Sequence, residues 1–192
     1  MKKLLCIFII IIAFVSCKED PLPKPKAYLR LDYPEPEYIE VNNLCNYSFE
    51  MNKIAQISNS RFKDSCWFDV KYSKMKGTIY LTYQPVNNDI DSLLRDTQNI
   101  TQEHIRKADE IVEQVFQDDK NKVFGMFYEV GGNAASQSQF YLTDSVNHFL
   151  SGAVYFFSKP NYDSIYPASE YLKNDIRHLM ESVRWKNLDS LN

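Results

Sequence analysis

The sequence WFDVKYSKMKGTIYLTY, residues 67–83, decides the fold. Its first six residues alternate apolar with polar side chains, and residues 77–83 are rich in aromatic and β-branched side chains. Both patterns are typical of β-strands. Residues 73–77 predict a short turn between them, so we expect the two strands to pair as a hairpin.

Further strands are expected towards the C-terminus, at residues 123–130, 139–143 and 148–158. A turn at residues 131–133 follows the first of these strands, and residues 144–147 connect the second to the third. Residues 47–57, before the hairpin, give a mixed signal.

Helices are predicted on both sides of these strands. Residues 89–99 form a first candidate, Thr101 is a suitable N-cap for a second, and residues 169–185 predict a closing helix. The apolar stripe of the second helix would comprise Ile105, Ala108, Ile111, Val112, Val115 and Phe116, and that of the closing helix Leu172, Ile176, Leu179, Met180 and Val183. This order of elements predicts an α+β class, with a single largely antiparallel sheet flanked by helices, and suits a Mog1/PsbP-like arrangement.

The composition agrees with one folded domain. Of the 192 residues, 44% are hydrophobic and 14% aromatic, which suffices for a packed core and excludes an intrinsically disordered chain. The 22 basic and 25 acidic side chains give a formal net charge of -3, which disfavours a surface that neutralises nucleic-acid phosphates.

The N-terminus carries an export signal. Two lysines follow Met1, an apolar run extends from Leu4 to Val15, and the small residue Ser16 precedes Cys17. These are the three parts of a secretory signal peptide, and the apolar run is too short for a bilayer core of roughly 30 Å. Residues 15–17 resemble the end of a bacterial lipobox, in which Cys17 becomes the N-terminus and is acylated with fatty acids such as palmitate. The alternative is an ordinary cleaved signal with an incidental cysteine.

A proline-rich segment follows the signal. Residues 18–36 hold five of the eight prolines, which excludes a helix and favours an extended tether. Four apolar side chains predict that its second half lies against the domain: Tyr28, Leu29, Leu31 and Tyr33. We therefore divide the chain into a signal peptide (1–16), an acylated cysteine with its tether (17–36), a globular domain (37–187) and a C-terminal tail (188–192).

The charge and the residue after Cys17 bear on localisation. Loss of the signal peptide removes two lysines and leaves 20 basic against 25 acidic side chains. Lys18 stands where an aspartate would favour retention in the inner membrane, so we expect an outer-membrane lipoprotein, on the periplasmic face rather than the cell surface.

Cysteine usage fits an exported protein. Cys6 leaves with the signal and Cys17 takes the lipid, so Cys45 and Cys66 form an even pair in an oxidising envelope. Such a pair predicts a disulfide. Two buried free thiols are the alternative.

The histidines predict no metal site and no cofactor. His104, His148 and His178 include no pair at the i, i+4 spacing of helical metal ligands, and no cysteine is spare.

Catalytic patterns are weak, and we expect no enzyme. Asp144, Ser145 and His148 supply the residue types of a hydrolase triad, but such triads assemble distant residues, and a hairpin turn explains the same cluster. Asp163 and Asp175 have no second carboxylate that would make a glycosidase pair.

One glycine-containing loop is a candidate for binding. It lacks the glycine patterns that hold phosphates, and it resembles a loop that contacts a sugar or a peptide. Its candidate interaction residues are Gly131, Gly132, Asn133, Ser136 and Gln139.

Several longer strings resemble one family. KPKAYLRLDYP at residues 24–34 and GNAAS at 132–136 are similar to motifs of the gliding-motility lipoprotein GldD family of Bacteroidota. So are QFYLTDS at 139–145, HFLSGAVYF at 148–156 and RWK at 184–186.

The resemblance implies an accessory lipoprotein that gliding motility and the type IX secretion system require. Its expected partners are other gliding-motility and type IX secretion lipoproteins and envelope components, with the membrane contacted through the lipid and no nucleic acid bound. A peptidoglycan- or glycan-binding module is the alternative function, and a serine hydrolase built on Ser145 and His148 is a weaker one.

Overall fold

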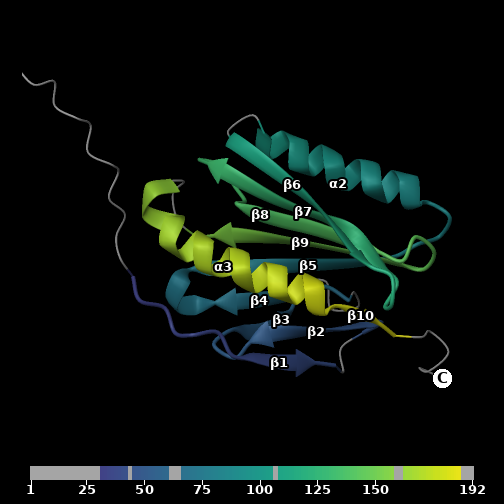
Figure 1. The fold of residues 1–192 in the computed structure, drawn as a ribbon, viewed down its shortest axis with the longest axis horizontal. Coiled ribbons are helices and arrows are strands. Elements are labelled where there is room, and N and C mark those ends of the chain that lie inside the picture. Colours follow the sequence, from purple (N-terminus) through teal and green to yellow (C-terminus); the bar gives the residue numbers. More distant parts are fainter. Residues whose placement is uncertain (1–30, 43–44, 61–65, 106–107, 158–161, 187–192) are drawn as a thin grey trace, which may run out of the picture.

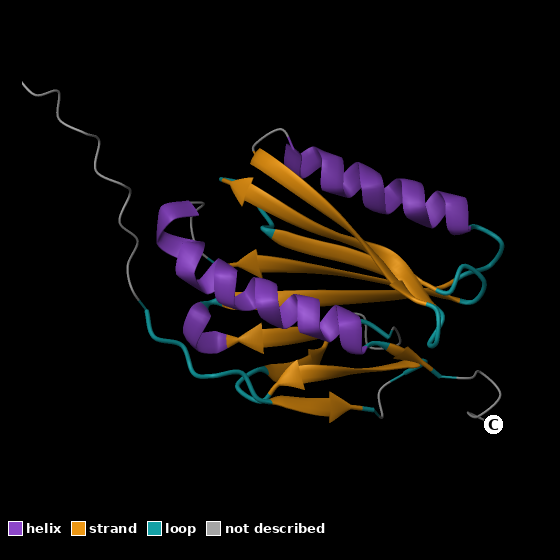
Figure 2. Ribbon diagram, in the orientation of Figure 1, coloured by secondary structure: helices purple, strands orange, loops and turns teal. Residues whose placement is uncertain are grey.

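The computed structural model describes residues 31–42, 45–60, 66–105, 108–157 and 162–186. These residues form a seven-stranded sheet, a three-stranded sheet and two long helices (Figures 1 and 2). The architecture confirms the predicted α+β class with one dominant antiparallel sheet, to which the structure adds a second, smaller sheet.

The large sheet is antiparallel throughout. Its strands lie in the order β3 (Gln56–Asn59), β4 (Phe68–Tyr72), β5 (Gly77–Pro85), β9 (His148–Phe156), β8 (Ser138–Thr143), β7 (Val123–Gly132) and β6 (Ala108–Asp118). The small sheet has the order β1 (Tyr38–Val41), β2 (Tyr47–Asn52) and β10 (Arg184–Trp185).

The predicted hairpin is present as β4 and β5. Val70 lies opposite Ile79 in its register, and a 3-10 turn at Ser73–Met75 connects the strands. Lys76 adopts the left-handed conformation that ends this turn, with φ of 53°. On its far side β5 pairs with β9, so the hairpin supplies the second and third strands of the sheet and lies beside its central strand, β9.

The two helices, α2 (Ile90–Ile105) and α3 (Tyr162–Ser182), pack on opposite faces of the large sheet. Glu129 of β7 points to α3, where its carboxylate lies 3.3 Å from the Lys173 ammonium. Its neighbour Tyr128 lies opposite Gln139 in the register, and Gln139 accepts a hydrogen bond from Thr101 of α2 at 3.4 Å. Because successive side chains of a strand point to opposite faces, the two helices sandwich the sheet.

The core lies between α3 and both sheets. Leu172, Ile176 and Leu179 of α3 are almost completely buried, and α3 contacts β2 of the small sheet as well as β5, β7, β8 and β9. The sheets contribute large buried side chains to the same cluster: Tyr47, Phe49, Ile79, Leu81, Phe127, Phe140, Leu142 and Leu150. The apolar stripe predicted for the closing helix is therefore the face that closes the core.

The second predicted helix, capped by Thr101, is wrong. Thr101 lies inside α2 and donates a hydrogen bond to the Thr97 carbonyl at 3.0 Å, and residues 108–118 form β6. Ile111, Val112 and Val115 happen to recur at helical spacing, yet they are β-branched side chains that suit a strand. Pairing of this segment with β7 outweighs its helical periodicity.

Other predicted boundaries shift by a few residues. The first predicted helix, 89–99, is confirmed as α2 and extends to Ile105. The closing helix begins earlier than predicted, at Tyr162, and ends at Ser182, so that Trp185 belongs to β10. The mixed segment 47–57 contains β2 and the start of β3.

Gly152 tests the packing between β8 and β9. A Cβ atom at this position would lie 2.3 Å from Cε1 of the buried Phe140 ring. We expect Gly152→Ala to lower the free energy of unfolding by about 1–3 kcal/mol, because the ring or the strand must shift. The measurement is urea unfolding of the mature chain. Gly131→Ala is the matched control, since its nearest new neighbour lies 3.8 Å away, and equal losses in both variants would contradict the packing argument.

Candidate functional site

The proposed acylation site, Cys17, lies outside the described residues, as do Tyr28 and Leu29. The structure nevertheless shows where the chain arrives at the domain. The Tyr33 ring packs on the Tyr171 ring of α3 with centroids 5.0 Å apart, and the Tyr171 hydroxyl donates to the Pro34 carbonyl at 3.0 Å. Tyr33 thus lies against the domain as expected, whereas Leu31 exposes 45% of its surface.

Beside this contact, a buried carboxylate joins β1 and β2 to α3. Asp175 accepts hydrogen bonds from the Tyr38 hydroxyl at 2.8 Å and from the Asn52 amide at 3.0 Å. Burial raises the pKa of Asp175, and hydrogen bonds from Tyr38, Asn52 and Tyr72 offset part of that rise. The Asn52 amide also donates to the Tyr171 hydroxyl, so the cluster is continuous with the contact at Pro34.

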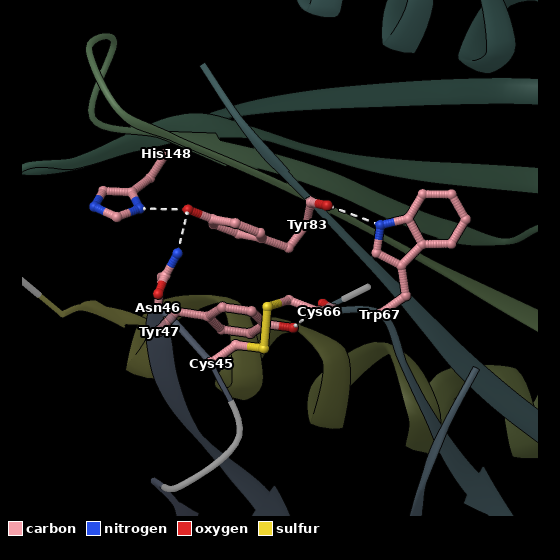
Figure 3. Close-up of a disulfide and its surroundings, with 7 residues drawn as sticks. All are labelled: Cys45, Asn46, Tyr47, Cys66, Trp67, Tyr83 and His148. Carbon is pink, nitrogen blue, oxygen red and sulfur yellow. Dashed lines mark hydrogen bonds between the residues drawn. A yellow bond between two sulfur atoms is a disulfide. The ribbon is translucent and has the colours of Figure 1, made fainter. Parts of the chain in front are cut away.

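Figure 3 shows the disulfide between Cys45 and Cys66, whose Cα atoms lie 5.8 Å apart. This bridge confirms the predicted pair and rules out two free thiols. It connects the entry to β2, in the small sheet, with the entry to β4, in the large one. The Tyr47 hydroxyl donates to the Cys66 carbonyl at 3.2 Å, which fixes the bridge to the aromatic core.

His148 belongs to the polar edge of the same aromatic cluster (Figure 3). The Asn46 amide donates to the Tyr83 hydroxyl at 3.3 Å, and that hydroxyl lies 2.9 Å from His148 Nδ1, to which its own proton can be donated. The His148 ring also stacks on Trp185 of β10 with centroids 4.9 Å apart. Burial lowers the pKa of His148, and the nearby Asp144 charge raises it only in part.

The hydrolase alternative is not supported by this geometry. Asp144 Oδ1 accepts backbone N–H bonds from Val146, Asn147 and His148 and so closes the turn between β8 and β9. Burial raises the pKa of Asp144, but these backbone bonds outweigh it and hold the pKa below its usual value. Ser145 is exposed at φ of 68°, while the His148 imidazole is engaged by Tyr83. The turn predicted for residues 144–147 is therefore the role of this cluster.

The candidate interaction loop is largely turned inward. Gly131 and Gly132 end β7, and Gly132 has a φ of 89°. Ser136 and Gln139 are buried, whereas Asn133 is exposed and its Oδ1 accepts the Tyr162 backbone N–H at 3.0 Å. Of the polar side chains predicted to make contacts here, the structure places only that of Asn133 at the surface.

The described residues contain neither a cluster of metal-ligand side chains nor a membrane-spanning helix. Within residues 31–42, 45–60, 66–105, 108–157 and 162–186, no three His, Cys, Asp or Glu side chains gather as a metal site would require. None of the helices in these ranges is long and apolar enough to span a membrane.

Comparison with known proteins then decides the family. The family model for the gliding motility lipoprotein GldD matches residues 18–185. The chain belongs to the GldD family. Family membership makes the chain a membrane-anchored protein of the cell envelope, and the family description names no reaction.

The comparisons with curated proteins and with solved structures add no information on function. No curated protein matches this GldD-family chain. Among solved structures, the chain is similar to cyanobacterial PsbP (CyanoP) from Synechocystis sp. PCC 6803, with a TM-score of 0.49 and 8% sequence identity. The match covers 86% of this chain and 99% of that one.

The Asp175 cluster is the feature that sequence reasoning missed. Asp175 was considered only as half of a carboxylate pair, whereas its partners are neutral hydroxyl and amide donors. A signal was present, because Asp175 falls between Leu172 and Ile176 on the stripe predicted to be buried. A lone acid on such a face predicts a buried carboxylate with hydrogen-bond donors around it.

Replacement of Cys45 and Cys66 by serine tests the bridge. The disulfide closes a loop with a sequence separation of 21 residues. Its loss should lower the free energy of unfolding by about 3 kcal/mol, through the greater freedom of the unfolded chain. Urea unfolding measures this loss, and the wild-type protein under reducing conditions should show the same shift. Unreduced wild-type protein that yields two alkylatable thiols in these positions would contradict the prediction.

The pH dependence of stability tests the burial of His148. Because its folded pKa is depressed, the unfolded chain takes up the proton first as the pH falls below the usual value of 6.5. The free energy of unfolding should therefore decrease on acidification from about pH 7.5 to about pH 5.5 and recover as the pH rises. His148→Gln retains an acceptor for Tyr83 without titrating in this range, so its decrease should be smaller. Identical pH profiles for the two proteins would exclude His148 as the cause.

Proposed function

We propose that this chain is an accessory outer-membrane lipoprotein required for gliding motility and type IX secretion. It acts by binding other envelope proteins and so supports the assembly or stability of motility and secretion components. The match of the GldD family model to residues 18–185 is the observation that carries this proposal. The contacts of Asp144 and His148 support a binding role over a hydrolytic one, since both groups serve the turn and the core.

The proposed anchor is an acyl group on Cys17. Each buried CH₂ group contributes about 0.8 kcal/mol to membrane binding, so two or more acyl chains anchor a protein almost permanently. Confinement to the membrane raises the effective concentration of the domain near partners in the same membrane. We favour the periplasmic face of the outer membrane, in keeping with Lys18 after the cysteine.

We favour protein binding over the glycan-binding alternative. That alternative uses the polar side chains of the loop that follows β7, and Ser136 and Gln139 of this loop are buried. A sugar that contacts these two side chains would require the loop to open.

Cys17→Ala tests the anchor. The variant should lose palmitate labelling, leave the membrane fraction and abolish most gliding, because diffusion in three dimensions replaces confinement to a surface. The readouts are metabolic labelling, fractionation and colony spreading in cells that lack the native copy. Cys6→Ala, in the predicted signal peptide, is the matched control and should behave as wild type. Full spreading by a soluble, unlabelled Cys17→Ala protein would refute membrane-tethered action.

A further inference from the structure

The outer strand β6 leaves a long edge of the large sheet open. In the part of the chain that the structure describes, β6 hydrogen-bonds only to β7 and forms the end of the strand order (Figure 1). It has 11 residues, whereas β3 at the other end has 4 and β1 of the small sheet has 4. A short edge offers little to a further strand, so β6 is the edge with room for one.

The protection of the β6 edge consists of acidic side chains and of one irregularity near its start. Its single irregularity in pairing falls between Ala108 and Glu110, and from Glu110 to Asp118 the register with β7 is continuous. The strand contains no proline and no lysine. The helix α2 packs against β6 and β9 on one face of the sheet, where its buried Thr101 bonds to Gln139, so it covers that face and not the backbone groups along the outer edge of β6.

Exposed side chains form the same pair on each face of this edge. Residues two positions apart in a strand point to the same face. Glu110 and Val112 therefore point to the face that α3 covers, and Glu113 and Val115 point to the face that α2 covers. All four are exposed, Val112 by 40% and Val115 by 77%. Each face therefore offers one carboxylate and, two residues later, one apolar side chain.

A hollow of about 280 Å³ lies beside Val115 on the α2 face. Apolar and aromatic side chains contribute to its wall: Leu94, Phe124, Met126 and Tyr141. A side chain of a strand added next to Val115 would reach this hollow. The edge thus combines backbone hydrogen-bonding groups with a place for one apolar side chain, which are the two elements of recognition by strand addition.

The acidic side chains of β6 favour a partner strand that carries basic residues. The 11 residues of β6 include the acids Asp109, Glu110, Glu113 and Asp118 and no base. Asp118 is paired with Asn121 and Arg184, while within the described residues Glu110 and Glu113 have no ion-pair partner. Two β6 strands from two copies would both be acidic and would offer no base to Glu110 or Glu113 in any register. A strand with basic residues opposite Glu110 and Glu113 is complementary.

We propose that β6 is a docking edge for an extended segment of another protein, with basic residues facing Glu110 and Glu113 and apolar residues facing Val112 and Val115. The proposal rests on the proposed function, that the chain acts by binding envelope proteins, and it names the surface. An antiparallel partner would read apolar–any–basic–apolar–any–basic along its own chain, so that its first apolar side chain enters the hollow beside Val115.

The test uses the mature lipidated chain in detergent and the peptide Val-Thr-Lys-Val-Thr-Lys as probe. The peptide should bind and shift the backbone amide resonances of β6 and of the residues around the hollow, and its affinity should fall as salt is added. Its analogue with both lysines replaced by glutamate should not bind. Val115→Lys should weaken binding by about tenfold, through lost apolar contact and added repulsion, while Val146→Lys, at an exposed valine in the β8–β9 turn, should have no effect.

The same two variants are then compared in cells. Val115→Lys should reduce spreading at unchanged abundance and unchanged palmitate labelling, and Val146→Lys should spread as wild type. Equal binding of the lysine and glutamate peptides, no binding of either, or normal spreading by Val115→Lys would overturn the docking edge. A dimer in sedimentation that Val115→Lys dissociates would also overturn it, in favour of a second copy. None of these results touches the anchor, which Cys17→Ala tests separately.

Discussion

The packing of α3 across both sheets is the interaction on which the rest of the structure depends. Its buried stripe of Leu172, Ile176 and Leu179 contacts the large sheet and β2 together. The small sheet is too short to be stable by itself, because strands of two to six residues bury little apolar surface. It persists because α3 covers it and because the Cys45–Cys66 bridge ties the entry to β2 to the entry to β4.

The buried carboxylate of Asp175 fixes the position of α3 relative to the small sheet. Asp175 lies on the buried stripe, and its two carboxylate oxygens accept from Tyr38 on β1 and Asn52 on β2. A shift of α3 along the small sheet would leave a buried carboxylate without donors, which costs more than the loss of apolar contact alone. Because Tyr171 also holds Pro34, the chain that arrives from the N-terminus is joined to the same helix face.

The sequence predicted those parts of the fold in which local pattern and tertiary environment agree. In the hairpin at 67–83 one face is buried and the other is mostly half-buried or exposed, so its alternation and its β-branched content indicate the same structure. The strand at 108–118 was predicted as a helix because its half-buried positions, 108, 111, 114, 116 and 118, do not follow a strict period of two. Their first three members are spaced by three residues, as on one side of a helix. The sequence places Asp175 on a buried stripe but does not identify its donors, because these come from β1, β2 and β4, more than 100 residues away in sequence. In the candidate loop the direction of each polar side chain depends on tertiary packing: Gln139 faces Thr101 of α2, and Asn133 contacts the start of α3.

The fold separates the anchored end of the domain from its open edge. The arriving N-terminal segment contacts α3 and shares a cavity with Gln56 of β3 and Tyr72 of β4, at one end of the strand order. The strand β6 is at the other end, six strand spacings away, or about 29 Å at ~4.8 Å per spacing. A partner strand added to β6 would extend the sheet away from residues 32–34, so this segment and the partner would not compete for the same surface. Glu110 and Val112 border a cavity together with Tyr166 and Lys173 of α3, so a strand added to β6 would also lie beside that helix. The contacts of Tyr33 and Pro34 with Tyr171, and the Cys45–Cys66 bridge, lie outside this cavity.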